Sequence, residues 1–300
     1  LSIIENAVEK NGFRFLYHPY KKVGNEFDAF ISSNNWSSYY ANYPYRIAPV
    51  SDDNPFFFFY TKFADLFRFP DSSIYTLYWA GQTILLYGSA LVLFLSVVFI
   101  GWPLFHLHKQ GRFIQDKYRF IIYFLCIGLA FMFVEIILMQ RFTLLLGQPI
   151  YSLSLVLCSL LIFAGLGSFY SQRLTENSFT NITGSFILLI TVLLATFSLS
   201  SWIFGVFLKE SLLVRAVISV FLLAPVSFLM GLPFPLGIRI AHDSSPEMVS
   251  WGWAINSYAS VLGAFLCVVL SIMFGFTTTY FTATALYGLS ALMILPLRCK

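Results

Sequence analysis

The sequence predicts an all-α polytopic membrane protein of about seven transmembrane helices, preceded by the tail of an α/β Rossmann-like domain. The first observation is composition: 58% of the 300 residues are hydrophobic, only 11% are charged, and the mean hydropathy is +0.76. Soluble domains carry about 25% charged residues, so the polar groups here cannot cover a water-exposed surface. This composition excludes an ordinary soluble enzyme and a disordered protein. A nucleic-acid-binding protein is excluded because the net charge of +4 forms no basic stripe.

The second observation is the mixed pattern of the N-terminal segment. Apolar residues recur at helical spacing over residues 3–8, and Asn11-Gly12 then ends this helix. The run FRFLYHPY, residues 13–20, alternates as a strand does. One helix and one strand cannot bury a core alone, so we expect residue 1 to lie inside a longer protein or assembly. We assign residues 1–75 to the tail of an α/β domain and residues 76–300 to a transmembrane helical domain.

An acidic and aromatic segment links the two parts. In SDDNPFFFFY, residues 51–60, Asp52, Asp53 and Asn54 before Pro55 predict a turn. The four phenylalanines that follow are too apolar for a solvated loop. We expect them to pack on a neighbouring domain or to enter the headgroup level of a bilayer, where aromatic rings are common.

Seven apolar stretches follow, each long enough to cross about 30 Å of hydrocarbon. They cover residues 77–100, 120–139, 150–170, 182–208, 212–238, 251–276 and 277–297. The fifth contains Pro225, Pro233 and Pro235, so we expect a kink or break near its end. The last two join with almost no loop, which predicts a tight hairpin.

Glu135 is the sharpest polar feature of these stretches. An ionisable group costs roughly 2.5 kcal/mol or more at mid-membrane and marks function by default. We therefore consider two roles for Glu135: a substrate, ion or proton site, or a polar clasp with Arg141, Arg239 or Asn256. Asn256 is an intramembrane amide that itself needs partners.

No cofactor or metal signature accompanies these residues. Four cysteines, none in a C-x-x-C pair, predict neither a disulfide framework nor a zinc site. A Gly-rich dinucleotide or phosphate loop is absent from the sequence. We expect no metal and no cofactor in this chain.

The motifs resemble the membrane region of bacterial spermidine synthase-like proteins. The likeness lies in SDDNPFFFFY at 51–60, in GLAFMFVEIILMQRFTLLLGQPIYSLSLVLCSLLIFAGLGS at 128–168, in MGLPFPLGIR at 230–239 and in WAINSYASVLG at 253–263. It carries the family's motif positions onto Asp52, Asp53, Pro55, Phe56, Glu135, Gln140, Arg141 and Gly147. Asn54 stands where that motif usually has arginine, so a salt bridge or anion contact is expected to be missing there.

This resemblance implies a function for the chain. Such proteins join a methyltransferase-like Rossmann domain, related to aminopropyltransferases, to several membrane spans. The chain would be the C-terminal membrane part, in the bacterial inner membrane. It would anchor a transferase whose catalytic core and S-adenosylmethionine-type ligand lie outside these residues. Two alternatives remain open: a transporter-like or ion-coupled membrane protein, and an accessory subunit of a larger membrane complex.

Overall fold

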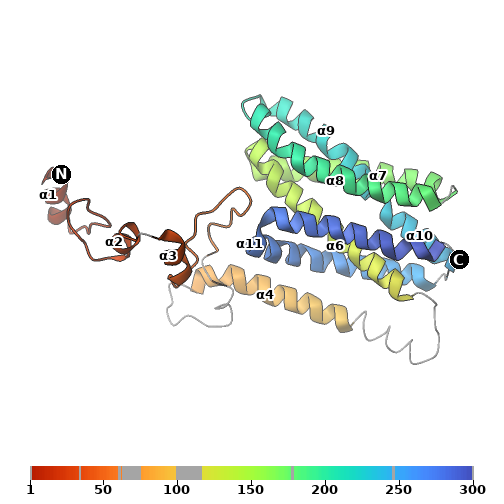
Figure 1. Cartoon of the computed structure of the whole chain (residues 1–300), viewed down its shortest axis with the longest axis horizontal. Helices are drawn as coiled ribbons and strands as arrows, with labels where there is room; N and C mark the ends of the chain where they lie inside the picture. Colours follow the sequence, from red (N-terminus) through yellow and green to blue (C-terminus); the bar gives the residue numbers. More distant parts are fainter. Residues whose placement is uncertain are drawn as a thin grey trace. The chain divides into compact units, whose positions relative to one another are not determined.

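The computed structural model describes residues 2–33, 35–59, 62, 76–98, 117–176, 179–244 and 247–298 (Figure 1). Every regular element among these residues is a helix. The chain divides into two compact units, which are described separately below. The first contains residues 1–51 and 55–82, and the second contains residues 52–54 and 83–300.

The first unit contains three short helices: α1 (Ser2–Lys10), α2 (Glu26–Ile31) and α3 (Trp36–Asn42). The helix predicted at the N-terminus is confirmed, and Gly12 follows it with a φ of 69°. The strand predicted over residues 13–20 is wrong, since no strand lies among the described residues of this unit. An extended segment needs a neighbouring strand for its backbone hydrogen bonds, and the described residues contain no such strand. The α/β tail is thus not seen here.

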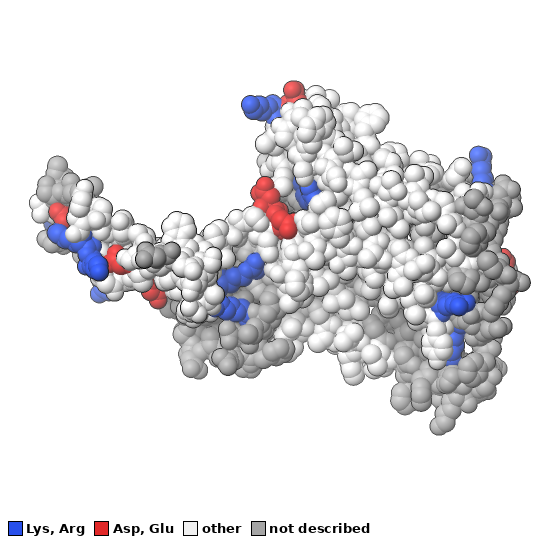
Figure 2. Space-filling model, in the orientation of Figure 1, with Lys and Arg blue, Asp and Glu red and all other residues white. Residues whose placement is uncertain are grey.

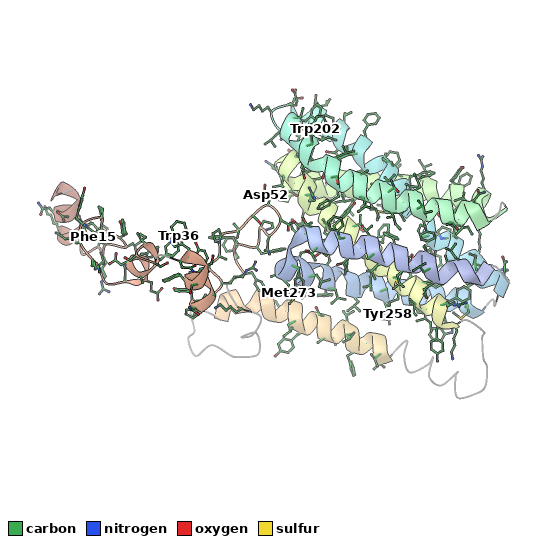
Figure 3. The ribbon with its side chains drawn as sticks, viewed as in Figure 1. Phe15, Trp36, Asp52, Trp202, Tyr258 and Met273 are labelled. Carbon is green, nitrogen blue, oxygen red and sulfur yellow. The ribbon has the colours of Figure 1, made fainter. Side chains whose placement is uncertain are left out.

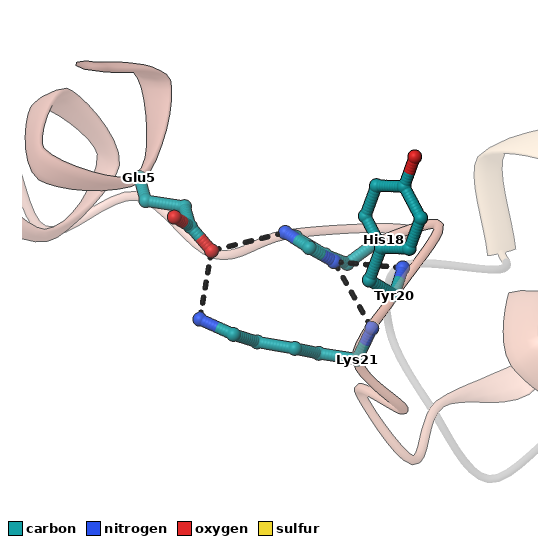
Figure 4. Close-up of polar contacts among 4 residues, drawn as sticks. All are labelled: Glu5, His18, Tyr20 and Lys21. Carbon is teal, nitrogen blue, oxygen red and sulfur yellow. Dashed lines mark hydrogen bonds and ion pairs between the residues drawn. The ribbon is translucent and has the colours of Figure 1, made fainter. Parts of the chain in front are cut away.

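A polar cluster holds the loop after α1 (Figure 4). The carboxylate of Glu5 accepts a hydrogen bond from Lys21 Nζ at 2.7 Å and lies 3.1 Å from His18 Nε2. His18 Nδ1 accepts the backbone N–H groups of Tyr20 and Lys21. Because Nδ1 is an acceptor, the proton of a neutral imidazole lies on Nε2 and is donated to Glu5. The ammonium of Lys21 lowers the pKa of Glu5.

An aromatic cluster joins α2 to α3. The ring of Phe30 lies 5.4 Å from that of Tyr39, 5.8 Å from that of Tyr40 and 6.0 Å from that of Trp36, measured between centroids. Asn25 and Asn35 cap the two helices through their side-chain oxygens. Aromatic packing and caps therefore replace a larger core here.

The second unit is a helical bundle. Its helices are α4 (Thr76–Ser96, from residue 83), α6 (Lys117–Leu146), α7 (Pro149–Glu176), α8 (Phe179–Phe207), α9 (Leu212–Met230), α10 (Pro233–Ser244) and α11 (Glu247–Arg298). Within the described residues, five segments are long and apolar enough to cross a membrane, and Ile84–Leu95 is a shorter apolar helix. The second to fifth predicted stretches each correspond to one segment, and the last two share Met248–Leu295. The first predicted stretch, whose residues 99 and 100 lie outside the described ranges, gives only the shorter helix. Seven spans are therefore not found among the described residues.

The bundle surface has the character expected of a lipid-facing one. Large apolar side chains such as Leu161, Trp202 and Phe221 are more than half exposed. Figure 2 shows charged residues near the two ends of the bundle and an uncharged surface between them on the face drawn. This distribution and the five apolar segments are compatible with an integral membrane protein.

Two helices are broken within the bundle. The predicted break in the fifth stretch is confirmed, because α9 ends at Met230 and α10 begins at Pro233. The predicted hairpin is confirmed within α11, which breaks at Gly275 with a φ of 85° and doubles back (Figure 1). The hydroxyls of Ser271 and Thr279 are 3.3 Å apart across this turn, whereas a straight helix would separate them by about 12 Å.

The core of the bundle is centred on α6. This helix packs most extensively against α11, while α7 packs mainly against α9. Small residues permit the closest approaches. A Cβ at Gly128 of α6 would collide with the backbone of Asn256 and the side chain of Ala259 in α11. A Cβ at Gly167 of α7 would collide with the backbone of Phe228 in α9. The buried α6 side chains that complete this core include Phe120, Tyr123, Phe124, Phe133, Val134 and Ile137.

Candidate functional site

The predicted Asp52–Asp53 motif belongs to the bundle, where it holds the break in α11. The backbone C=O of Asp53 accepts the N–H of Phe276 at 2.8 Å. Its Oδ1 accepts both the N–H of Thr277, at 2.8 Å, and the Thr277 hydroxyl, at 2.5 Å. Asp53 thus acts as an N-cap supplied by a distant segment for the arm of α11 that follows Gly275.

Asn54 acts on the other side of the same break. Its side-chain Nδ2 donates to the C=O of Ile272 at 3.1 Å, near the end of the first arm of α11. Backbone groups freed by a broken helix need partners at membrane depth. Asp53 accepts hydrogen bonds from free N–H groups of the second arm of α11, and Asn54 donates one to a carbonyl of the first arm. Asn54 thus serves this backbone contact as an uncharged donor.

A cavity of about 510 Å³ lies beside this motif. Residues from the motif, from α6, from the end of α8 and from the turn of α11 line it, namely Asp52, Asp53, Arg141, Leu144, Phe197, Ser201, Phe204, Gly205, Leu208, Phe276 and Thr277. We call this the Asp–Arg cavity. Figure 3 labels Asp52 at the end of the bundle where α11 turns. The cavity brings together Asp52, Asp53 and Arg141, from two motifs far apart in the sequence.

Two residues of α8 hold Arg141 in place. Its Nη2 donates to Ser201 Oγ at 2.7 Å, and its guanidinium carbon lies 3.9 Å from the centroid of the Phe197 ring. A cation over an aromatic face at this distance is attracted by the ring. Among the described residues Arg141 forms no ion pair within 4.0 Å, although its charge interacts with that of Asp53. Gln140 is exposed and does not line the cavity.

Glu135 does not form the predicted clasp. It makes no hydrogen bond or ion pair with a described residue, so the expectation of a partner in Arg141, Arg239 or Asn256 is wrong. The reason is helix geometry, because the side chains of residues 135 and 141 point about 120° apart around α6. Glu135 is half-buried, and its charge instead acts on Tyr287. The Tyr287 hydroxyl is itself buried without a hydrogen-bond partner in the described part of the chain.

A second cavity, of about 410 Å³, lies at the break between α9 and α10. It brings together the predicted residues Pro233, Pro235 and Asn256, and Tyr287 also lines it. We call this the helix-break cavity. Prolines at 233 and 235 provide no N–H, so backbone carbonyls of the preceding turn lose their helical donors. Pro225 lies inside α9 and Arg239 on α10, and neither lines the two cavities.

The end of α6 has a cap that the sequence did not indicate. Arg215 of α9 donates from Nη1 to the C=O of Leu145 at 2.7 Å. Gly147, with a φ of 81°, then ends the helix. Ser201, Phe197, Thr277 and Tyr287 were also missed, since each is an ordinary residue of an apolar helix with no local pattern to distinguish it.

No family model matches the chain, and neither a curated protein nor a solved structure matches it. The likeness to spermidine synthase-like proteins therefore depends on the sequence motifs alone. Within the described residues, no three His, Cys, Asp or Glu side chains come together as a metal site would need.

Proposed function

We propose that the chain is the membrane domain of a spermidine synthase-like protein. In this role it holds an S-adenosylmethionine-type transferase domain, which lies outside this chain, at the inner face or outer face of a bacterial inner membrane. The catalytic core and the cofactor belong to that other domain. The helices described here supply the anchor and a fixed attachment point.

One observation supports this proposal above the others. The acidic motif at residues 52–54 is hydrogen-bonded into the bundle through Thr277 and Ile272, at a helix break. A loop that serves only as a linker has no need of such contacts. The same motif meets Arg141 of the second motif in one cavity.

The test is ligand binding and transfer by the full-length protein in lipid nanodiscs. We expect calorimetry to detect an S-adenosyl ligand, and we expect transfer of an aminopropyl or methyl group to an amine acceptor. If the full-length protein neither binds an S-adenosyl ligand nor transfers either group, the proposal is overturned. The chain of residues 1–300, which keeps the motif at residues 52–54, is the matched control and should bind no such ligand.

A second candidate is a transporter-like or ion-coupled protein. Glu135 without a partner among the described residues, with a charge that acts on the buried Tyr287, favours it. Discontinuous helices such as α9–α10 form binding sites in transporters. The test is solute uptake into proteoliposomes with Glu135→Gln. Loss of uptake with intact folding supports transport, and uptake unchanged by the variant argues against a coupled role.

A further inference from the structure

We infer that the Asp–Arg cavity binds a zwitterionic group, with its anionic end on Arg141 and its ammonium end on the aspartates. This inference does not depend on the proposed transferase function, because it uses only the charges and contacts of the cavity. It assigns a ligand class to a site for which the resemblance gave only motif positions.

Arg141 provides the anion-binding side. A guanidinium has five N–H donors in a planar fork, and Ser201 uses one of them here. The contact with the Phe197 ring holds the plane in place without consuming donors. Because the described residues provide no further hydrogen bond to Arg141, the rest of the fork can bind a carboxylate or phosphate in two places at once.

The aspartates provide the ammonium-binding side. Oδ1 of Asp53 is occupied by the amide and hydroxyl of Thr277, so its position is fixed. Asp52 is exposed and makes no hydrogen bond or ion pair with any residue in the described ranges. An ammonium group in the cavity therefore meets one anchored and one free carboxylate.

The charges select against ligands of a single sign. Arg141 and the two aspartates face one cavity, yet no ion pair within 4.0 Å joins them in the described structure. Much of the remaining lining is apolar, including Phe204 and Phe276. Opposite charges act strongly across such low-dielectric walls. A pure anion is opposed by the aspartates and a pure cation by Arg141, whereas a zwitterion satisfies both.

The surroundings of the cavity suit a group from the surface of a bilayer. Ser201 is in the last turns of α8, and its neighbour Trp202 is 67% exposed. Tryptophan is enriched at the headgroup level of membranes. The ligand could thus be the phosphoethanolamine head of a lipid or a free zwitterion from water, and these two sources share the chemistry that the cavity recognises.

The experiment measures binding to the full chain purified in a zwitterion-free detergent. The probes are phosphoethanolamine, ethanolamine and inorganic phosphate, each by calorimetry. We expect phosphoethanolamine to bind at least about tenfold more tightly than ethanolamine or inorganic phosphate. Each of those two probes lacks one of the two charged contacts, and the loss of one charge-assisted contact weakens binding by about this factor. Equal affinities for the three probes, or no binding of phosphoethanolamine, would overturn the inference, whatever the behaviour of variants.

Variants then locate the site. Arg141→Gln and Asp52→Asn should each weaken phosphoethanolamine binding at least about tenfold. Arg173→Gln is the matched control, because Arg173 lies in the last turn of α7, far along the bundle from Arg141, and should bind as the parent does. Binding that survives both cavity variants places the ligand elsewhere and refutes the assignment.

Lipid analysis separates the two sources. Mass spectrometry of lipid retained after purification should show phosphatidylethanolamine enriched in the parent and depleted in Arg141→Gln if the ligand is a headgroup. Equal retention in both proteins, with tight phosphoethanolamine binding, identifies a water-soluble zwitterion instead. Either result supports a zwitterion site.

Discussion

The carboxylate of Asp53 binds the amide and hydroxyl of Thr277, a residue 224 positions further along the chain. These two hydrogen bonds connect the acidic motif to the turn of α11 at Gly275. They also place the carboxylate on the wall of the Asp–Arg cavity. One side chain thus contributes both to the fold and to the candidate site.

Replacing Asp53 tests the first of these contributions. Asp53→Ala removes the acceptor for two donors of Thr277, and the free energy of unfolding should fall by about 1–2 kcal/mol, as for a lost helix cap. Asp53→Asn keeps an oxygen in this place and should lose less. The measurement is thermal or chemical unfolding of both variants in the same detergent. Equal stability of Asp53→Ala and the parent would show that the cap contributes nothing.

Gly275 tests the turn itself. Its φ of 85° disfavours any side chain, and a Cβ there would meet the carboxylate of Asp53. Gly275→Ala should therefore destabilise the bundle by about 1–3 kcal/mol. Gly184→Ala is the control, because Gly184 is helical with open space around it. That change should be neutral or stabilising, and a similar loss in both variants would argue against strain at the turn.

The sequence predicted the bundle better than it predicted the site. Apolar runs and the prolines at 233 and 235 are local signals, so the apolar segments and the break after Met230 were foreseen. The strand over residues 13–20 failed because alternation alone provides no partner strand. The last two stretches merged into α11 because a single glycine, Gly275, makes the turn.

Site contacts depend on helix rotation and on distant pairing, which a sequence does not display. The clasp of Glu135 with Arg141 failed because the two residues lie on different faces of α6. The cap of Thr277 by Asp53 joins segments with no shared local pattern. Arg141 was a candidate from its place in the motif, but its support by Ser201 and Phe197 depends on how α8 packs.

The polar cluster of the first unit predicts a pH dependence. The hydrogen bond from Lys21 lowers the pKa of Glu5 below its ordinary value of 4.5. A lowered pKa in the folded state means that the contact stabilises the unit above about pH 4.5 and that this stabilisation is lost as the pH falls through the folded pKa. NMR titration of the Glu5 carboxyl in the full chain measures this pKa. Lys21→Gln should raise the Glu5 pKa toward 4.5, and an unchanged pKa would contradict the role of Lys21.

The contact between α7 and α9 gives a prediction with a matched control in the same helix. A Cβ at Gly167 would collide with the backbone of Phe228, whereas one at Gly165 would meet nothing within 4 Å. Gly167→Ala should force the two helices apart and lower the free energy of unfolding by about 1–3 kcal/mol. Gly165→Ala should leave it unchanged or slightly raised, because alanine favours a helix. Unfolding of the two variants in one detergent decides the matter: losses of equal size would mean that close packing at Gly167 does not stabilise the bundle.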